Sequence, residues 1–270
     1  MMGLLMRKRL LSGFGALALV CSGTAYSCVL RMAAEINFPP YLMLKEQHWQ
    51  GQTVELAQLL ATEVGCELQI VNVPWLRALA QIKSGELDLV SHLSYSDARK
   101  NDFAFIGPHH IESMWLIGDP SKLPKVNSLK DLSEDVDLGR IAELIGAYYG
   151  EEFALLKQNP FFARQLVSIS SIQDKLALLE AGRVNAILED ESVLYYWQIQ
   201  GYKNARHYQP LLPIYESPVY FGFSKKTLSK PMLIRLQNAW QTLYERGEIE
   251  KRLKGKQSKT SKPLTPSAKL

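Results

Sequence analysis

The fold is decided by two similar stretches of sequence, LAQIKSGELDLV at residues 79–90 and LALLEAGRVNAI at residues 176–187. Each stretch has apolar residues at helical spacing, then a glycine that ends the helix, then a short apolar run typical of a buried strand. Helices that alternate with buried strands indicate a mostly parallel sheet with helices on both faces. Because the unit occurs twice, we expect two similar α/β lobes; the alternative is a chance likeness of two helix-glycine-strand units.

The alternation of strands and helices continues outside these stretches. Residues 28–33 and 66–71 read as strands, and Thr53 is the expected cap of a helix between them. Residues 171–174, Ser-Ile-Gln-Asp, form a capping box that predicts the start of the second helix. Nearer the carboxyl end, alternating residues at 219–223 predict a strand that begins after three prolines.

The composition is that of a globular protein. With 270 residues, 47% hydrophobic and 21% charged, the chain is not a disordered segment, a fibre or a disulfide-rich miniprotein. Its net charge of +4 belongs to its ends, because the first 27 and last 20 residues carry basic residues and no acid. The chain between them is mildly acidic, which argues against nucleic acid as a partner. Residues 251–270 read as a disordered basic tail.

The amino-terminal residues 1–27 read as a secretory signal peptide. Three basic residues, Arg7 to Arg9, precede an apolar run at 10–20 and small residues that end at Ser27. The apolar run is too short to span a bilayer, so we expect cleavage after Ser27 and an exported, periplasmic protein. The alternative is a lipoprotein signal in which Cys21 or Cys28 is acylated.

Cleavage after Ser27 leaves two cysteines, Cys28 and Cys66, in an oxidising compartment. Each opens an expected strand. If these are successive parallel strands joined by a crossover helix, both cysteines lie at the same end of neighbouring strands. A disulfide between them is therefore predicted, and two unrelated buried thiols are the alternative.

The candidate binding residues follow the two buried strands, where open parallel sheets bind their ligands. Residues 91–99 are dense in hydroxyls and end in Arg99, which is expected in the first turn of a helix capped by Ser96. An arginine there opposes the helix dipole, so a role in binding a carboxylate would explain it. The second strand is followed by acids, among them Asp190. Across a cleft, these groups suit a zwitterion; a surface arginine and a helix cap are the alternative.

Other chemistry lacks its motifs. The sequence contains neither a phosphate-binding glycine loop nor a Gly-x-Ser-x-Gly elbow, and no cysteine in a catalytic setting. His109 and His110 are adjacent, a spacing that rarely places both side chains on one metal ion. We therefore expect no cofactor, no metal site and no catalysis.

Several short motifs stand in a characteristic order along the chain: Pro39-Pro40-Tyr41, Gly51, Pro74-Trp75, residues 84–88, residues 94–99 and Phe103-Ala104-Phe105. In this order they resemble the bacterial extracellular solute-binding proteins of family 3, the type II periplasmic receptors for amino acids and related polar solutes. The resemblance runs from about Leu30 to Gly247. It implies two α/β lobes, joined by two hinge crossings, that close over a ligand.

The resemblance also implies boundaries for the lobes. Lobe 1 would comprise residues 28–109 and 221–250, and lobe 2 residues 114–216. The hinge crossings would lie at residues 110–113 and 217–220.

Carried over position by position, the resemblance implies that Arg99 binds the α-carboxylate of the ligand. Ser94 would add its hydroxyl and His92 a backbone contact. Asp190 occupies the position that holds the α-ammonium group. Phe38 and Trp75 stand where aromatic side chains enclose the ligand.

Other positions depart from the family pattern or leave their role open. Glu35 stands where receptors for basic amino acids have an acid, and Arg77 points either into the cleft or to solvent. In the second-lobe anion-binding turn, Ala147 replaces the usual hydroxyl residue and Tyr148 brings a bulky ring toward the cleft. His109 replaces the tyrosine common at the first hinge.

The resemblance implies a monomeric receptor that captures an amino acid or a related zwitterion for an ABC-type transporter. One alternative is a periplasmic dehydratase similar to cyclohexadienyl dehydratase, with Glu35, Glu143 or Glu189 as the acid. Another is a ligand sensor for a membrane signalling protein on a separate chain.

Overall fold

The computed structural model describes residues 28–35, 38–134 and 136–253. The predicted signal peptide and residues 254–270 of the predicted tail lie outside the described residues. Among those described, no helix is both long enough and apolar enough to cross a bilayer.

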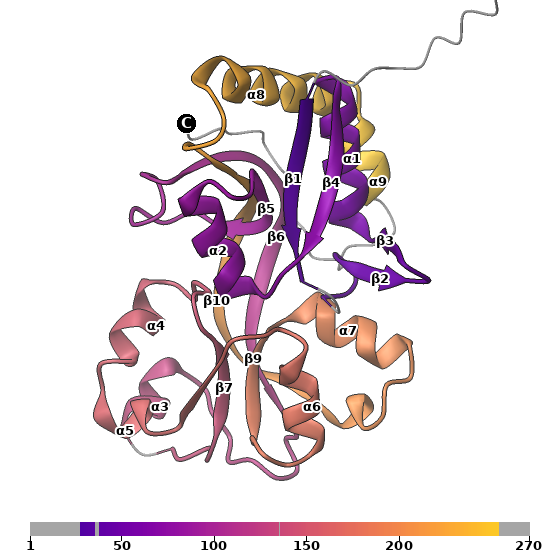
Figure 1. The fold of residues 1–270 in the computed structure, drawn as a ribbon. Coiled ribbons are helices and arrows are strands. Elements are labelled where there is room, and N and C mark those ends of the chain that lie inside the picture. The colour runs from indigo at the N-terminus through magenta and orange to yellow at the C-terminus, as the bar shows by residue number, and fades with distance from the viewer. Residues whose placement is uncertain (1–27, 36–37, 135, 254–270) are drawn as a thin grey trace, which may run out of the picture.

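Eight strands form one sheet in the order β4-β1-β5-β10-β6-β9-β7-β8 (Figure 1). A short hairpin, β2 (Met43–Lys45) and β3 (His48–Gln50), stands beside it. The strands of the large sheet are β1 (Cys28–Ala34), β4 (Cys66–Asn72), β5 (Leu89–Ser94), β6 (Phe103–Gly118), β7 (Ile141–Leu144), β8 (Leu166–Ile169), β9 (Ala186–Asp190) and β10 (Gln209–Ser224).

Strands β6 and β10 run side by side through the whole molecule and connect an upper and a lower half (Figure 1). The upper half contains β1 to β5 with helices α1 (Gln52–Glu63), α2 (Trp75–Ser84), α8 (Lys230–Glu245) and α9 (Glu248–Leu253). The lower half contains β7 to β9 with α3 (Leu129–Glu134), α4 (Glu151–Leu156), α5 (Pro160–Ala163), α6 (Asp174–Glu180), α7 (Glu191–Ile199) and the short 3-10 helix η1 (Ala205–His207).

Within each half the pairing is parallel, as the two repeated stretches predict. Strand β1 pairs in parallel with β4 and β5, and β7 with β8 and β9. In the large sheet every antiparallel pair includes β6 or β10, and the separate hairpin of β2 and β3 is also antiparallel. The predicted α/β fold with mostly parallel strands and flanking helices is therefore confirmed.

The predicted hinge crossings are parts of the two central strands, which pair with each other there. Glu112 of β6 pairs with Ser217 of β10, and Ile111 pairs with Pro218. The lobe boundaries around them stay a prediction. The strand predicted at 219–223 is longer than expected, because β10 already begins at Gln209 and includes the three prolines. The register of its pairing with β6 shifts at two of these prolines, which have no N–H to donate to the ladder.

Two helix starts differ from their predictions. Helix α1 is preceded by Gly51 rather than capped by Thr53, which lies inside the helix. Gly51 has φ 124°, and a Cβ atom there would collide with the carbonyl of Tyr41, so this position requires glycine. Helix α6 begins at Asp174 without a side-chain cap, because the hydroxyl of Ser171 binds elsewhere.

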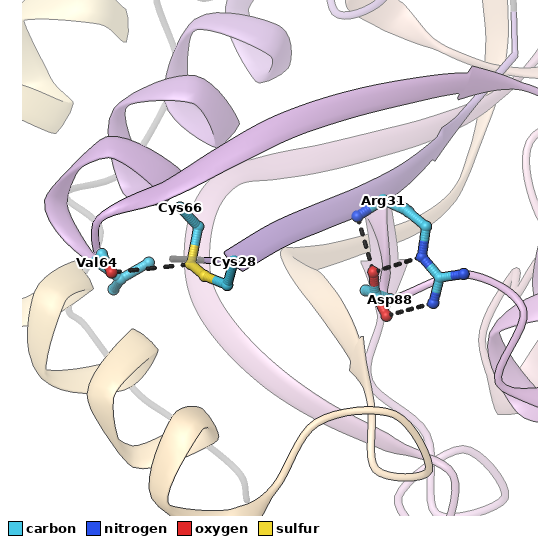
Figure 2. The surroundings of a disulfide bond; sticks show 5 residues. All are labelled: Cys28, Arg31, Val64, Cys66 and Asp88. Atoms are coloured by element: carbon cyan, nitrogen blue, oxygen red, sulfur yellow. Dashed lines mark hydrogen bonds and ion pairs between the residues drawn. A yellow bond between two sulfur atoms is a disulfide. The ribbon is translucent and has the colours of Figure 1, made fainter. Parts of the chain in front are cut away.

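The predicted disulfide between Cys28 and Cys66 is present (Figure 2). The two residues are register partners at the start of the parallel strands β1 and β4, with their Cα atoms 4.8 Å apart. Nearby, Asp88 accepts hydrogen bonds from the backbone N–H and the guanidinium of Arg31, which ties β1 to the segment before β5. The amino-terminal strand is thus held to both neighbours at one end of the sheet.

The predicted tail begins later than residue 251. Helix α9 continues to Leu253, whose side chain is buried and belongs to the core of the upper half. Its first turn is acidic and its last turn basic, an arrangement that favours the helix dipole. Residues 251–253 are therefore part of the folded protein, contrary to the prediction.

Candidate functional site

A small, partly open cavity lies between the two halves, beside the central strands. Residues of both halves and of β6 form its wall: Phe38, Trp75, His92, Ser94, Arg99, Glu112, Met114, Leu144, Ala147, Tyr148, Tyr149, Ile172, Lys175 and Glu189. Several come from the carboxyl ends of β5, β7 and β9, as expected for a ligand site on parallel strands. The cavity is therefore the candidate binding site.

Seven residues predicted from the sequence meet in this wall: Phe38, Trp75, His92, Ser94, Arg99, Ala147 and Tyr148. Their contact with a ligand stays a prediction. Arg77 is exposed on helix α2 and does not line the cavity. Glu35 and Asp190 lie behind the wall, for reasons given below.

Arg99 lies in a turn after β5 rather than in the predicted helix capped by Ser96. Its guanidinium donates to the carbonyl of Ser94 at 2.8 Å and, across the cavity, to the carbonyl of Gly146 at 2.7 Å. A guanidinium has five N–H donors, so three remain for a ligand. Burial lowers the pKa of Arg99 to about 10, which leaves it charged at neutral pH. Arg99 can therefore bind a carboxylate with two parallel hydrogen bonds.

Glu35 connects the two halves instead of lining the cavity. One carboxylate oxygen accepts the N–H of Trp75 in the upper half at 2.7 Å. The other accepts the N–H of Ile172 at 2.7 Å and the hydroxyl of Ser171, both in the lower half. This second set of bonds explains why the predicted capping box is wrong, since Ser171 donates to Glu35 rather than serving helix α6.

Asp190 is the N-cap of helix α7, the alternative reading of this residue. Its Oδ1 accepts the N–H of Ser192 at 2.7 Å and the hydroxyl of Tyr41 at 3.2 Å, while Oδ2 accepts the N–H of Ser113 at 3.1 Å. Its side chain is buried, and burial raises its pKa to about 6 despite these bonds. The predicted contact between Asp190 and an ammonium group stays a prediction.

Lys175 and Glu189 form a buried ion pair in the lower wall, with 3.0 Å between Nζ and Oε2. Sequence reasoning missed Lys175 as a site residue. A lysine in the first turn of a helix opposes the helix dipole, and the same observation that identified Arg99 would have singled it out. The sequence singles out Glu189 both as one of the carboxylates after the second strand and as a candidate acid for a dehydratase. Each of the two buried charges, Lys175 and Glu189, has the other as its ion-pair partner, and Oε1 of Glu189 also accepts the N–H of Asp190.

Glu112 is a further acidic side chain of this wall, and sequence reasoning did not predict it. It lies on β6, and the hydroxyl of Ser94 donates to it at 3.3 Å. Burial raises its pKa to about 8, and the negative charges of Asp190 and Glu189 add to this effect. Because its approach to the cavity depends on how the two halves meet, nothing local in the sequence marks it.

His92 of the upper wall packs against His109, His110 and Tyr41, which lie behind it. The Nδ1 atoms of His109 and His110 are 2.8 Å apart, and the ring of His110 stacks on Tyr41 with centroids 4.6 Å apart. Burial lowers the pKa of all three histidines, that of His109 to about 4. Among the described residues, no group of His, Cys, Asp or Glu has the geometry to hold a metal ion.

The wall thus combines charges of both signs with apolar surface. Its wall includes the charged side chains of Arg99, Glu112, Lys175 and Glu189 together with aromatic rings such as Trp75 and Tyr148. With Glu112 ionised, the two positive and two negative side chains of the wall balance, so the cavity suits a small molecule that itself carries both charges.

Comparisons with known proteins agree with this arrangement. Residues 30–255 match the bacterial extracellular solute-binding proteins, family 3. A search of curated proteins found no match. An amino-acid ABC transporter substrate-binding protein from Streptococcus pneumoniae, bound to L-arginine, is 25% identical, with a TM-score of 0.68 over 84% of this chain and 94% of its own.

Two other solved structures share the fold at lower identity. A histidine kinase sensor domain is 19% identical, with a TM-score of 0.70 over 83% of this chain and 93% of its own. An ancestral amino-acid-binding precursor of cyclohexadienyl dehydratase is 18% identical, with a TM-score of 0.67 over the same shares. The order of motifs, the fold and the family match agree: the chain belongs to family 3 of the bacterial extracellular solute-binding proteins.

Proposed function

We propose that the protein is a monomeric periplasmic receptor that captures an amino acid or a closely related zwitterion and presents it to an ABC-type transporter. The observation that carries the proposal is the cavity between the halves, whose wall includes both Arg99 and the acidic side chains of Glu112 and Glu189. The α-carboxylate would bind Arg99 and the hydroxyl of Ser94. The resemblance to a substrate-binding protein of an amino-acid transporter supports this role.

Ligand binding would be coupled to closure of the two halves. A ligand between them contacts both only when they are together, so it stabilises the closed form. The direct bond from Arg99 to the carbonyl of Gly146 already spans the cavity mouth and would reinforce that form. A transporter could then distinguish the closed receptor from the open one.

The two alternative functions have less support. The three acids considered for a dehydratase are all engaged: Glu35 by backbone N–H groups, Glu143 by Lys157, and Glu189 by Lys175. The likeness to a sensor domain rests on the fold alone. Turnover of prephenate or arogenate by the purified protein would favour the enzyme.

A thermal-shift screen tests the proposal. The full chain is expressed with its own leader, collected after export and refolded from denaturant to remove carried ligand. At a hundred times its dissociation constant, a ligand stabilises the protein by about 2.7 kcal/mol, or about 5 to 10 °C in Tm. We expect such a shift with one class of α-amino acid and none with the matching acids that lack the amino group.

Arg99→Ala tests the binding mode. We expect it to remove most of the shift, because a buried bidentate contact to the carboxylate is lost. Arg183→Ala, at an exposed arginine of the lower half, is the matched control and should keep the full shift. Equal shifts in both variants would exclude Arg99 as the carboxylate site, and a shift only with acids lacking an ammonium group would exclude the zwitterion.

A further inference from the structure

Three acidic side chains, Glu112, Glu189 and Asp190, lie in or behind the cavity wall, and two of them are already engaged. Asp190 accepts three hydrogen bonds from protein donors and does not line the cavity. Glu189 pairs with the ammonium group of Lys175. Among the described residues, Glu112 is the acid that faces the cavity with a single hydroxyl, that of Ser94, as its hydrogen-bond donor.

The position of Glu112 suits contact with a ligand that spans the site. It lies on the central strand β6, opposite Ser217 of β10, where the two halves meet. Arg99 and Glu112 both line the cavity and both contact Ser94, through its carbonyl and its hydroxyl respectively. An α-amino acid whose carboxylate binds Arg99 therefore has its ammonium group within the part of the cavity that Glu112 faces.

We propose that Glu112, rather than Asp190, accepts the ammonium group of the bound zwitterion, and that this contact expels a proton from the site. The inference rests on the proposed function. It identifies the acid that completes the site and predicts that ligand capture depends on pH.

Glu112 carries a proton before the ligand binds because it is buried near other negative charges. Burial and the carboxylates of Asp190 and Glu189 raise its pKa to about 8, so the ligand-free side chain is mostly protonated at pH 7. The charged and titratable groups that act on Glu112 are Asp190, Glu189, Lys175, Arg99, Tyr41, Tyr149 and Tyr215. An ammonium group in contact favours the carboxylate form, so the proton leaves as the ligand enters.

The pH dependence has a definite sign. Because binding releases a proton, affinity rises as pH rises, about tenfold per pH unit up to about pH 8, and is then constant. If Asp190 held the ammonium group instead, the rise in affinity with pH would end near pH 6, because the pKa of Asp190 is about 6. The two acids are therefore distinguished by the pH at which the slope ends.

Isothermal titration calorimetry at pH 7 in phosphate and in Tris measures the protons released. The probes are the proteinogenic L-amino acids that bind in the thermal-shift screen, and the refolded full chain is used. We expect release of about 0.9 proton per ligand if Glu112 makes the contact and about 0.1 if Asp190 does. Binding with about 0.1 proton released overturns the inference and leaves the proposed function intact. If no amino acid binds, both fail.

Two isosteric variants assign the proton to its residue. Glu112→Gln should weaken binding at pH 8 and abolish proton release. Asp190→Asn should keep proton release, at a reduced level, because the loss of one negative neighbour lowers the pKa of Glu112. The opposite pattern overturns the inference. The wild-type pH profile alone decides between the two acids if either variant does not fold.

Discussion

His109 illustrates how burial sets the protonation state of a single residue. One ring nitrogen, Nε2, is 2.6 Å from the carbonyl of Ser91, and Nδ1 faces Nδ1 of His110. A positive charge on this buried ring could not be solvated by water, so burial lowers the pKa of His109 to about 4. The unfolded chain takes up a proton near pH 6.5, and the folded chain does so only at much lower pH.

This difference makes His109 a source of acid sensitivity. Below pH 6.5 the unfolded state binds more protons, so the contribution of His109 to the free energy of unfolding falls by about 2 kcal/mol between pH 7 and pH 5. We expect the stability advantage of wild type over His109→Gln to shrink by that amount, measured by urea unfolding at both pH values. His207→Gln, at an exposed histidine, should show no such change. Parallel pH curves for wild type and His109→Gln would contradict the prediction.

At the scale of elements, the first parallel pair of the sheet depends on a covalent link. Strands β1 and β4 are joined at Cys28 and Cys66 and enclose helix α1 between them in sequence. A disulfide across 38 residues restricts the unfolded chain more than a short loop would. The pairing of β1 with β5 covers only two register positions, so β4 is the main partner that holds the amino-terminal strand.

We expect the double variant Cys28→Ser/Cys66→Ser to lose about 2 to 4 kcal/mol of unfolding free energy, measured by urea unfolding. Adding dithiothreitol to the wild type should lower its stability to the same level. The same reductant should leave the double variant unchanged, which serves as the control. A loss below about 0.5 kcal/mol in the double variant would show that the strands hold together without the link.

At the scale of the whole molecule, the two halves make direct contacts across the cleft. Glu35 of the upper half accepts the hydroxyl of Ser171 and the N–H of Ile172 of the lower half. In the opposite direction, Tyr41 of the upper half donates to Asp190 of the lower half. These bonds exist only when the halves are together, so they stabilise the closed form relative to an open one without contributing to either half alone.

Ser171→Ala should therefore change closure rather than folding. Loss of a hydrogen bond to a carboxylate costs about 1.5 kcal/mol, so amino-acid affinity should fall roughly tenfold. Small-angle scattering should show a larger radius of gyration without ligand, while the urea midpoint stays near that of wild type. Ser170→Ala, at the exposed neighbouring serine, is the matched control. Identical affinities and radii in the two variants would contradict this role of Ser171.

Much of this protein follows from its sequence, because the relevant features are local. The two repeated stretches, which contain Gly85 and Gly182, predict helices that end at a glycine and are followed by buried strands, since side-chain periodicity is a short-range property. The cysteines at the starts of two strands predict the disulfide. Arg99 lines the cavity as expected, although it lies in a turn and not in the helix on which the argument from the helix dipole depended, and its contact with a ligand stays a prediction.

Only the tertiary structure decided how the two halves complete the site. Ser171 reads locally as a helix cap, yet it donates to Glu35, which is 136 residues away in sequence. The resemblance predicts that Asp190 holds an ammonium group, and only the structure shows that it also caps helix α7 and accepts the hydroxyl of Tyr41. Glu112 faces the cavity because β6 runs between both halves. Such contacts depend on how the two halves pack against each other. They join segments that are far apart in sequence, so the local pattern of one segment does not predict its partner.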